Sequence, residues 1–261
     1  AAAARAHAVE HGKDIRQRTM IAFGGAAPLH AARLAEKLGV SRVIVPDGAG
    51  VGSAIGFLLT PASYEIIRSL PMRLDAFDEK RVASLFASLR KEAEDVVRAA
   101  APGAALTETR AAFMRYVGQG YEVPVPLAAA SIAQTRMSVD ALRSAFEAAY
   151  RALYGRVIPG MAIEILSWSL RVAAPTPLAE KIAPPKALRE AAPIGVREAF
   201  DAGAKRRLAY SVYDRARLAP GDRVKGPSLI VEAQTTTVVS ARFDAAIDGA
   251  RNIILTRKAD L

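Results

Sequence analysis

The sequence of 261 residues contains no cysteine, only three histidines and a single tryptophan. Without cysteine there is no disulfide scaffold, no cysteine-ligated metal and no thiolate nucleophile. The three histidines all lie before residue 31, which leaves no convincing Ser-His-Asp set for nucleophilic catalysis. These absences exclude several common kinds of enzyme site before any motif is considered.

Long apolar runs are also missing. No stretch reaches the roughly 18 residues that a membrane-spanning helix needs. The N-terminal AAAARAHAVEH carries Arg, His and Glu, unlike a secretory signal. We therefore expect a soluble, cytoplasmic protein with no membrane partner. Because 51% of the residues are hydrophobic, wholesale disorder is excluded, and the length allows one large domain or two smaller ones.

The formal net charge is +10, which raises the question of a nucleic-acid partner. Residues 181–261 hold much of the excess, with 15 basic and 9 acidic side chains, and the only dense run there is Lys205-Arg206-Arg207. A nucleic-acid face usually has a longer basic stripe within a recognisable module, and no zinc finger, basic zipper or aromatic RNA-binding signature is present. We expect no nucleic-acid partner. A solvated face, or a face that meets an acidic partner subunit, explains the charge better.

The first 60 residues follow an alternating pattern of helix and strand. The expected elements are a helix over 2–11, a strand over 18–22, a helix from Pro28 to Gly39, a strand over 41–46, a turn over 47–50 and a buried helix over 51–59. This order predicts an α/β arrangement for residues 1–60.

The pattern changes at Pro61. Two amphipathic helices are predicted, over 78–101 and 139–153. The expected strands lie over 63–70, 107–116, 121–127, 162–173, 206–213, 228–232, 235–239 and 252–257. Residues 174–193 hold five prolines, which indicates a linker or a strap across a surface. The sequence therefore predicts an α+β, β-rich C-terminal domain over 61–261.

The segment from Ala22 to His30 (AFGGAAPLH) contains the clearest candidate binding site. A strand that ends in Gly24-Gly25 before a helix suits a flat polar ligand, because glycine lets the backbone come close and the helix N-terminus offers free N–H groups. A tight turn without a ligand is the alternative. The segment is neither a P-loop, since no Lys-Ser/Thr follows, nor GxGxxG.

Several segments carry a resemblance to a known family. The order strand, Gly-Gly, helix, strand resembles the closing part of the actin-like ATPase fold, in which a Gly-Gly pair holds adenosine. The segments AFGGAAPLHAARLAEKLGVSRVIVP (22–46), VGSAIGFLL (51–59), MRYVGQGYEVPV (114–125), GPSLIVE (226–232) and TTTVV (235–239) are similar to the C-terminal part of the hydantoinase A / 5-oxoprolinase family. That family includes ATP-dependent N-methylhydantoinases, 5-oxoprolinases and the A-type subunits of acetone and acetophenone carboxylases.

The resemblance implies ATP with Mg as cofactor and a hydantoinase B-type subunit as partner. The assembled enzyme would open a cyclic amide, a hydantoin or a lactam, with ATP cleavage. Carboxylation of a ketone is an alternative, and a non-catalytic assembly or binding module is a second one. Gly24, Gly25 and Ala26 would line the adenosine end through their backbone. His30 would cap the helix, pack, or approach the nucleotide. No catalytic residue and no metal ligand is assigned.

The chain departs from the family pattern in two ways. Ala27 stands where the family commonly has a third glycine, and the family's N-terminal phosphate-binding loops and acidic Mg-associated residues have no counterpart. The chain also begins within a predicted helix and without Met. We therefore expect a C-terminal fragment or a split subunit. The Mg ligands would then lie in the remaining N-terminal part of the A-type chain, and the isolated chain would show no turnover.

A pair of histidines near the N-terminus is a candidate metal site. His7 and His11, four residues apart, share a helix face. No third ligand is obvious, so exposed helix-end histidines are the preferred interpretation, and no metal is predicted.

Two polar segments could contribute chemistry. Gln119 between two glycines predicts a bulge or a close backbone approach, and Glu122 could act there as a general base if it were buried. A strand bend with surface polar groups is the preferred interpretation, and a role at a substrate site or a subunit contact is the alternative. The segment 234–237 (QTTT) favours a strand and has no adjacent base, which argues against a threonine nucleophile.

Overall fold

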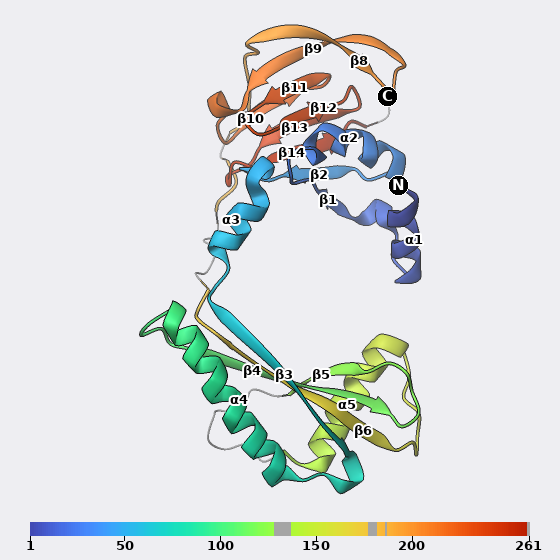
Figure 1. Cartoon of the computed structure of the whole chain (residues 1–261). Helices are drawn as coiled ribbons and strands as arrows, with labels where there is room; N and C mark the ends of the chain where they lie inside the picture. The colour runs from blue at the N-terminus through green and yellow to red at the C-terminus, as the bar shows by residue number, and fades with distance from the viewer. Residues whose placement is uncertain (128–136, 177–181, 186, 260–261) are drawn as a thin grey trace. The chain divides into compact units, whose positions relative to one another are not determined.

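The computed structural model describes residues 1–127, 137–176, 182–185 and 187–259 (Figure 1). They form two compact units. Unit 1 combines residues 1–59 with the described part of 179–261, and unit 2 lies within residues 60–178. The predicted second domain, 61–261, is therefore divided, because its last strands fold together with the N-terminal residues.

A six-stranded sheet forms the centre of unit 1. Its order is β1 (Thr19–Ile21), β2 (Arg42–Val45), β14 (Ile253–Arg257), β13 (Phe243–Ile247), β10 (Asp222–Lys225) and β7 (Arg189–Glu190). β1 is parallel to β2, which pairs antiparallel with β14, so that Val43 lies opposite Leu255 and Val45 opposite Ile253. All four side chains are fully buried. The alternate apolar residues of β2 and β14 are buried on the same face of the sheet, in one core. Their common burial favours pairing between strands from the two ends of the chain.

A four-stranded sheet contributes to the same core. Its order is β12 (Thr236–Val239), β11 (Ser228–Val231), β9 (Arg206–Asp214) and β8 (Gly195–Asp201), with β9 and β11 parallel and the other pairs antiparallel. Tyr213, Ile230 and Val239 are its buried contributions. The strands predicted at 206–213, 228–232, 235–239 and 252–257 are all present, with ends that agree to within one residue.

The three α-helices in the described part of unit 1 differ in how they are packed. Helix α2 (Ala27–Leu38) has Pro28 in its first turn, where no N–H is needed, and ends at Gly39 with φ of 77°. It buries Ala31, Ala32, Ala35 and Leu38 against the sheets. By contrast, α1 (Ala2–Glu10) and α3 (Gly52–Leu59) have no buried residue. The expectation of a buried helix over 51–59 is therefore wrong about burial within this chain.

Unit 2 is an antiparallel sheet with two helices. The strand order is β3 (Ser63–Arg73), β6 (Ile163–Ala173), β4 (Thr107–Tyr116) and β5 (Val123–Leu127), and the helices are α4 (Glu79–Ala100) and α5 (Val139–Tyr154). The side chains of Asp78 and Ser138 cap the two helices by accepting backbone N–H bonds. Trp168 and Phe86 pack edge to face, 5.7 Å between centroids, in the core. Both predicted helices are confirmed.

The proline-rich segment lies only partly within the described residues, since 177–181 and 186 are outside them. Of the described part, β7 pairs parallel with β10 at the edge of the six-stranded sheet. A Cβ atom on Gly221 would stand 2.3 Å from the carbonyl oxygen of Ala187, and one on Gly249 would stand 2.1 Å from that of Ala183. These two glycines therefore let the segment lie directly on the end of the sheet.

Among the residues that the structure describes, no helix combines the length and the apolar character that crossing a bilayer requires.

Candidate functional site

Two glycine-containing loops of unit 1 lie side by side at one edge of its central sheet. Gly24 follows β1, and the turn Asp47–Gly50 follows β2. Because β1 and β2 are parallel neighbours, their carboxyl ends meet at the same edge, where open α/β sheets bind ligands. The N–H of Gly24 donates to the carbonyl oxygen of Ala49 at 2.6 Å, which ties the loops together. Gly24 has φ of 99°, a conformation that favours glycine.

The N-terminus of α2 opens from the first of these loops. Ala26 is its N-cap residue and offers no side-chain oxygen to the helix, so the first amide groups lack a side-chain acceptor. Gly25, Ala26 and His30 are all exposed. Ala27, which replaces the third glycine of the family pattern, is the first residue of the helix. A right-handed helical conformation needs no glycine, and the substitution leaves the turn intact.

The turn between β11 and β12 covers one side of the loops. The hydroxyl of Thr235 donates to the carbonyl oxygen of Gly25 at 2.7 Å. A Cβ atom on Gly50 would stand 2.4 Å from Cβ of Gln234, so only glycine permits this approach. The sequence predicted the threonines as strand residues; Thr236 and Thr237 lie in β12, whereas Thr235 precedes that strand. The sequence did not predict the place of Thr235 at the glycine loop, because nothing local relates residue 235 to residue 25.

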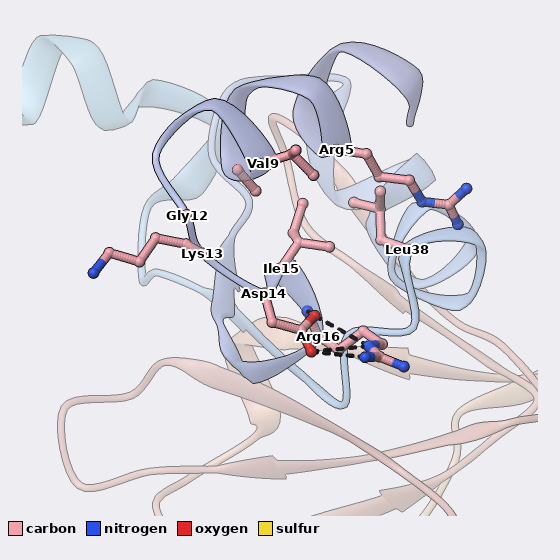
Figure 2. Close-up of a pocket in the computed structure, with 9 residues that line it drawn as sticks. Arg5, Val9, Gly12, Lys13, Asp14, Ile15, Arg16 and Leu38 are labelled. Carbon is pink, nitrogen blue, oxygen red and sulfur yellow. Dashed lines mark hydrogen bonds and ion pairs between the residues drawn. The ribbon is translucent and has the colours of Figure 1, made fainter.

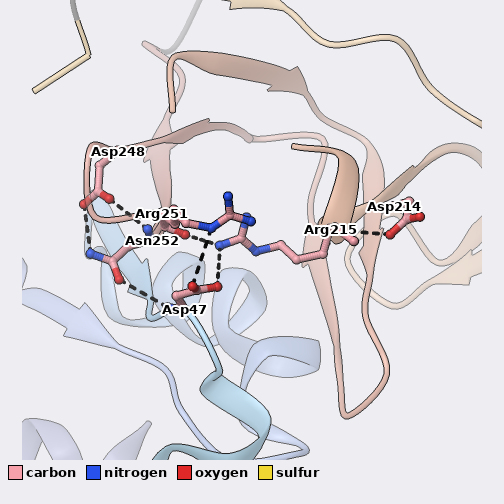
Figure 3. A network of polar contacts seen from close by, with 7 residues as sticks. Asp47, Asp214, Arg215, Asp248, Arg251 and Asn252 are labelled. Atoms are coloured by element: carbon pink, nitrogen blue, oxygen red, sulfur yellow. Dashed lines mark hydrogen bonds and ion pairs between the residues drawn. The ribbon is translucent and has the colours of Figure 1, made fainter. Parts of the chain in front are cut away.

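A polar network holds the second loop (Figure 3). Arg215, only 4% exposed, donates from Nη2 to Oδ1 of Asp47 at 3.2 Å and also to the carbonyl oxygen of Arg251. The side-chain amide oxygen of Asn252 accepts the N–H of Asp47 at 3.2 Å, and Asp248 accepts two bonds from Asn252. Nη1 of Arg215 is buried without a partner among the described residues. Sequence reasoning did not find this network, which joins residues about 170 to 200 positions apart.

Charged groups near the loops have shifted pKa values. Burial lowers the pKa of Arg215, against the opposing effects of Asp47 and Glu232. Burial raises the pKa of Glu232, Arg215 opposes that rise, and the negative charge of Asp47 adds to it. The site therefore combines open backbone amides with a buried cation.

Two hollows flank helix α1, away from the glycine loops. One, of about 670 Å³, lies between α1 and residues 12–16, with Asp14 and Arg16 paired at 2.8 Å on its wall (Figure 2). The other, of about 450 Å³, is mostly apolar and includes Met20, Leu34 and Val40. These hollows show that apolar surface beside α1 is open in this chain.

The histidine pair has a potential third ligand that sequence reasoning missed. Ligand atoms of His7, Glu10 and His11 lie within 4.8 Å of one another, because Glu10 is three residues after His7 on the same helix face. The carbonyl oxygen of His7 lies 2.9 Å from Nδ1 of His11. All three side chains are exposed, and the absence of a metal remains a prediction.

The polar segment around Gln119 lies in unit 2, as the connection between β4 and β5. Nε2 of Gln119 donates to the hydroxyl of Tyr150 at 2.8 Å, and Gly118 has φ of 90°. The segment is therefore a hairpin loop and not a bulge within one strand. Glu122 is exposed, so the condition for a buried general base is not met.

Comparisons with known proteins agree with the resemblance in the sequence. The hydantoinase/oxoprolinase family model matches residues 1–66, and the model of the hydantoinase/oxoprolinase C-terminal domain matches residues 76–258. The caprolactamase subunit alpha of Pseudomonas jessenii is 29% identical over 254 residues, which cover 95% of this chain and 36% of that protein.

Two solved structures are similar throughout the chain. A nucleotide-free structure of acetone carboxylase, from work on the mechanism of ATP-dependent acetone carboxylation, has a TM-score of 0.75 and 28% identity, covering 97% of this chain and 37% of the other. The ATP-dependent caprolactamase from Pseudomonas jessenii has a TM-score of 0.70 and 29% identity, covering 98% and 38%. The chain spans little more than a third of the length of these relatives. It belongs to the hydantoinase/oxoprolinase family and corresponds to the C-terminal region of that family's chains.

Proposed function

We propose that this chain is the C-terminal part of an ATP-dependent, cyclic-amide-opening subunit of the hydantoinase/oxoprolinase family. The observation that carries the proposal is the Gly24-Gly25 loop, which opens onto the free N-terminus of α2 at the carboxyl ends of two parallel strands. Similarity to an ATP-dependent caprolactamase supports a lactam or hydantoin as substrate. Similarity to acetone carboxylase supports ketone carboxylation as the alternative reaction.

The proposed role of the loop is to hold the adenosine end of ATP. In this proposal residues 1–60 contain the closing part of an actin-like ATPase subdomain. Gly24, Gly25 and Ala26 would contact adenine and ribose through backbone atoms, and His30, one turn into α2, would approach from the side. The residues fit such a ligand, since a Cβ on Gly24 would meet nothing within 4 Å and the helix amides are free to face polar groups.

When bound, ATP with Mg would supply the phosphoryl group that activates an amide or enolate oxygen. The residues of this chain would bind and orient the adenosine, while Mg ligands and catalytic groups would come from elsewhere in the assembly. Asp47, the carboxylate at the start of the second loop, is engaged by Arg215 and Arg251. We accordingly expect no turnover from this chain alone.

The exposed apolar surface of unit 1 supports a further part of the A-type chain as a partner. Phe57 and Leu58 in α3 are each 83% exposed, and Ile21 at the end of β1 is 61% exposed. A helix as apolar as α3, in which Ser53 is the one polar residue, is normally buried. The proposed occupant is the remaining N-terminal part of an A-type chain. A hydantoinase B-type subunit is the second proposed partner, and a cytoplasmic location stays a prediction of the sequence.

A charge inserted at the glycine loop tests the proposed nucleotide site. Gly25→Asp would place a carboxylate at the exposed loop, and we expect the dissociation constant for ATP and adenosine to rise at least about tenfold, by repulsion and lost backbone contact. Gly120→Asp is the matched control, because Gly120 is also exposed and a Cβ there meets nothing within 4 Å. Titration calorimetry measures the dissociation constants of both variants, in this chain and in a longer A-type chain that contains it. Equal affinity in the two variants would remove the assignment.

The β8–β9 hairpin favours a second candidate, a non-catalytic assembly module. Val196 and Phe200 on the edge strand β8 are 68% and 66% exposed. Around them, Arg197 and the run Lys205-Arg206-Arg207 form no ion pair with any described residue. A basic, apolar sheet edge suits an acidic partner strand.

Gel filtration and calorimetry with a B-type subunit distinguish the two candidates. Partner association without nucleotide binding would favour the assembly module, and ATP binding without a partner would favour the nucleotide site. In the first case Phe200→Asp should abolish association, whereas Tyr121→Asp, at an exposed aromatic of unit 2, should not.

A further inference from the structure

We propose that Thr235 is a positioning residue for the glycine loop: its hydroxyl aims the first free amide of α2 toward the nucleotide. The inference rests on the proposed adenosine site and adds to it a residue from the opposite end of the chain. It follows from four features of the contact between residue 235 and residue 25.

The first feature is the hydrogen bond itself. Thr235 is 8% exposed, and its Oγ1 donates to the carbonyl oxygen of Gly25 at 2.7 Å, within a unit whose core it borders. Water therefore has little access to compete for the carbonyl. A buried neutral hydrogen bond of this length holds its acceptor in one orientation.

The second feature is the planarity of the peptide unit. The carbonyl of Gly25 and the N–H of Ala26 belong to the same trans peptide, so they point in opposite directions. Fixing the carbonyl toward Thr235 fixes the N–H of Ala26 away from it. That N–H has no partner among the described residues. Ala26 is the N-cap residue of α2, where partial positive charge gathers.

The third feature is the freedom of the loop without this bond. Gly24 and Gly25 are consecutive glycines, which allow many backbone conformations. The N–H of Gly24 is tied to Ala49 at 2.6 Å, but that bond lies before Gly25 and leaves its carbonyl free to rotate. Thr235 supplies the restraint at this point.

The fourth feature is the rigidity of the turn that carries Thr235. The N–H of Glu232 donates to the carbonyl oxygen of Thr235 at 3.1 Å and closes the turn between β11 and β12. Gln234, next to Thr235, lies so close to Gly50 that a Cβ there would be 2.4 Å away. The turn therefore packs against both loops, and the hydroxyl of Thr235 is held in place by a rigid turn.

The test removes the hydroxyl and keeps the shape of the side chain. In Thr235→Val we expect hydrogen exchange of the segment 24–27 to accelerate about tenfold or more at the amide of Gly24, because its bond to Ala49 opens more often once the following carbonyl is released. The dissociation constant for ATP should rise by a similar factor. Thr235→Ser should restore both values, because it keeps the donor. Thr237→Val is the matched control: Thr237 is fully buried in β12, and its hydroxyl has no partner among the described residues, so both readouts should stay at the wild-type value.

Hydrogen exchange separates this proposal from the proposed function. Wild-type exchange of the segment 24–27 in Thr235→Val would overturn the positioning role, whether or not the chain binds nucleotide. So would equal acceleration in Thr235→Val and Thr237→Val, which would indicate general loosening of β12. Faster exchange in Thr235→Val alone, in a chain that binds no ATP or adenosine, would uphold the positioning role and reject the adenosine site.

Discussion

At the scale of single residues, the clearest test of stability lies in unit 2. Glu108, with a side chain 9% exposed, accepts bonds from Arg90 at 2.6 Å and from Arg110. Burial acts to raise the pKa of Glu108, but the hydrogen bonds from both arginines outweigh it, and its pKa is lowered. Glu108→Gln should reduce the free energy of unfolding by about 2 kcal/mol at neutral pH, because charged hydrogen bonds are replaced by weaker ones.

The same carboxylate predicts a pH dependence. Its pKa is lower in the folded state, so the stability that it contributes is present above its ordinary value of 4.5 and is lost as the pH falls through the lowered value. The difference between wild type and Glu108→Gln should therefore shrink in acid. Trp168, the only tryptophan and fully buried in unit 2, reports this in urea titrations by fluorescence. A difference that stays constant with pH would contradict the assignment.

Individual residues of the candidate site were predictable only where the signal is local. Gly24-Gly25 before a helix with Pro28 can be read from adjacent letters, and the structure places them together at the end of β1. Asp47, Arg215 and Thr235 could not be read in this way. Their contacts depend on pairing between strands at the two ends of the chain, and no short-range pattern encodes that pairing.

At the scale of elements, α3 is the helix whose burial was predicted wrongly from the sequence. Its apolar residues predict burial, yet Leu58 is 83% exposed. Leu58→Ser should change the free energy of unfolding by under about 0.5 kcal/mol, as at other exposed sites, while lowering the binding of a dye specific for apolar surface. Leu38→Ser, at a leucine only 5% exposed in α2, should cost about 3 kcal/mol. Thermal melting by circular dichroism measures both, and a large loss in Leu58→Ser would mean that α3 is packed within this chain.

Most other elements were predictable, for reasons visible in their residues. Helix α4 repeats apolar positions at helical spacing, from Val82 through Phe86 and Leu89 to Val97, and all four are buried. Such periodicity is local and survives any tertiary arrangement. Burial of α3 was not predictable, because an apolar helix needs a partner surface and the sequence does not say which chain provides it.

At the scale of the whole molecule, the division into units leads to a further prediction. Unit 1 is built from two distant segments, so peptides 19–45 and 243–257 should lose protection from hydrogen exchange at the same urea concentration. Peptides from 79–116 in unit 2 should lose protection from hydrogen exchange at a different urea concentration. Exchange by mass spectrometry across a urea series measures this. Peptides 19–45 opening together with 79–116 would refute the division.

The domain division itself could be predicted only in part. The change of pattern at Pro61 is a local signal, and it lies close to the true start of unit 2 at residue 60. The return of the chain to unit 1 was hidden, since β14 could pair with any exposed strand of suitable register. Only the match of buried positions in β2 and β14 selects the partner.

Because β14 lies far after β2 in the chain, the pair that they form can be completed only late in synthesis. Strand β2 leaves the ribosome about 200 residues before its neighbour, which at roughly 5–20 residues per second is a delay of about 10–40 seconds. Throughout that interval one flank of β2 has no strand beside it, and unit 2 is completed before the interval ends. The nascent chain therefore passes through a stage in which unit 2 is complete while the six-stranded sheet of unit 1 still lacks β14. At this stage the exposed edge of β2 is the surface that a chaperone or a co-translated subunit would protect.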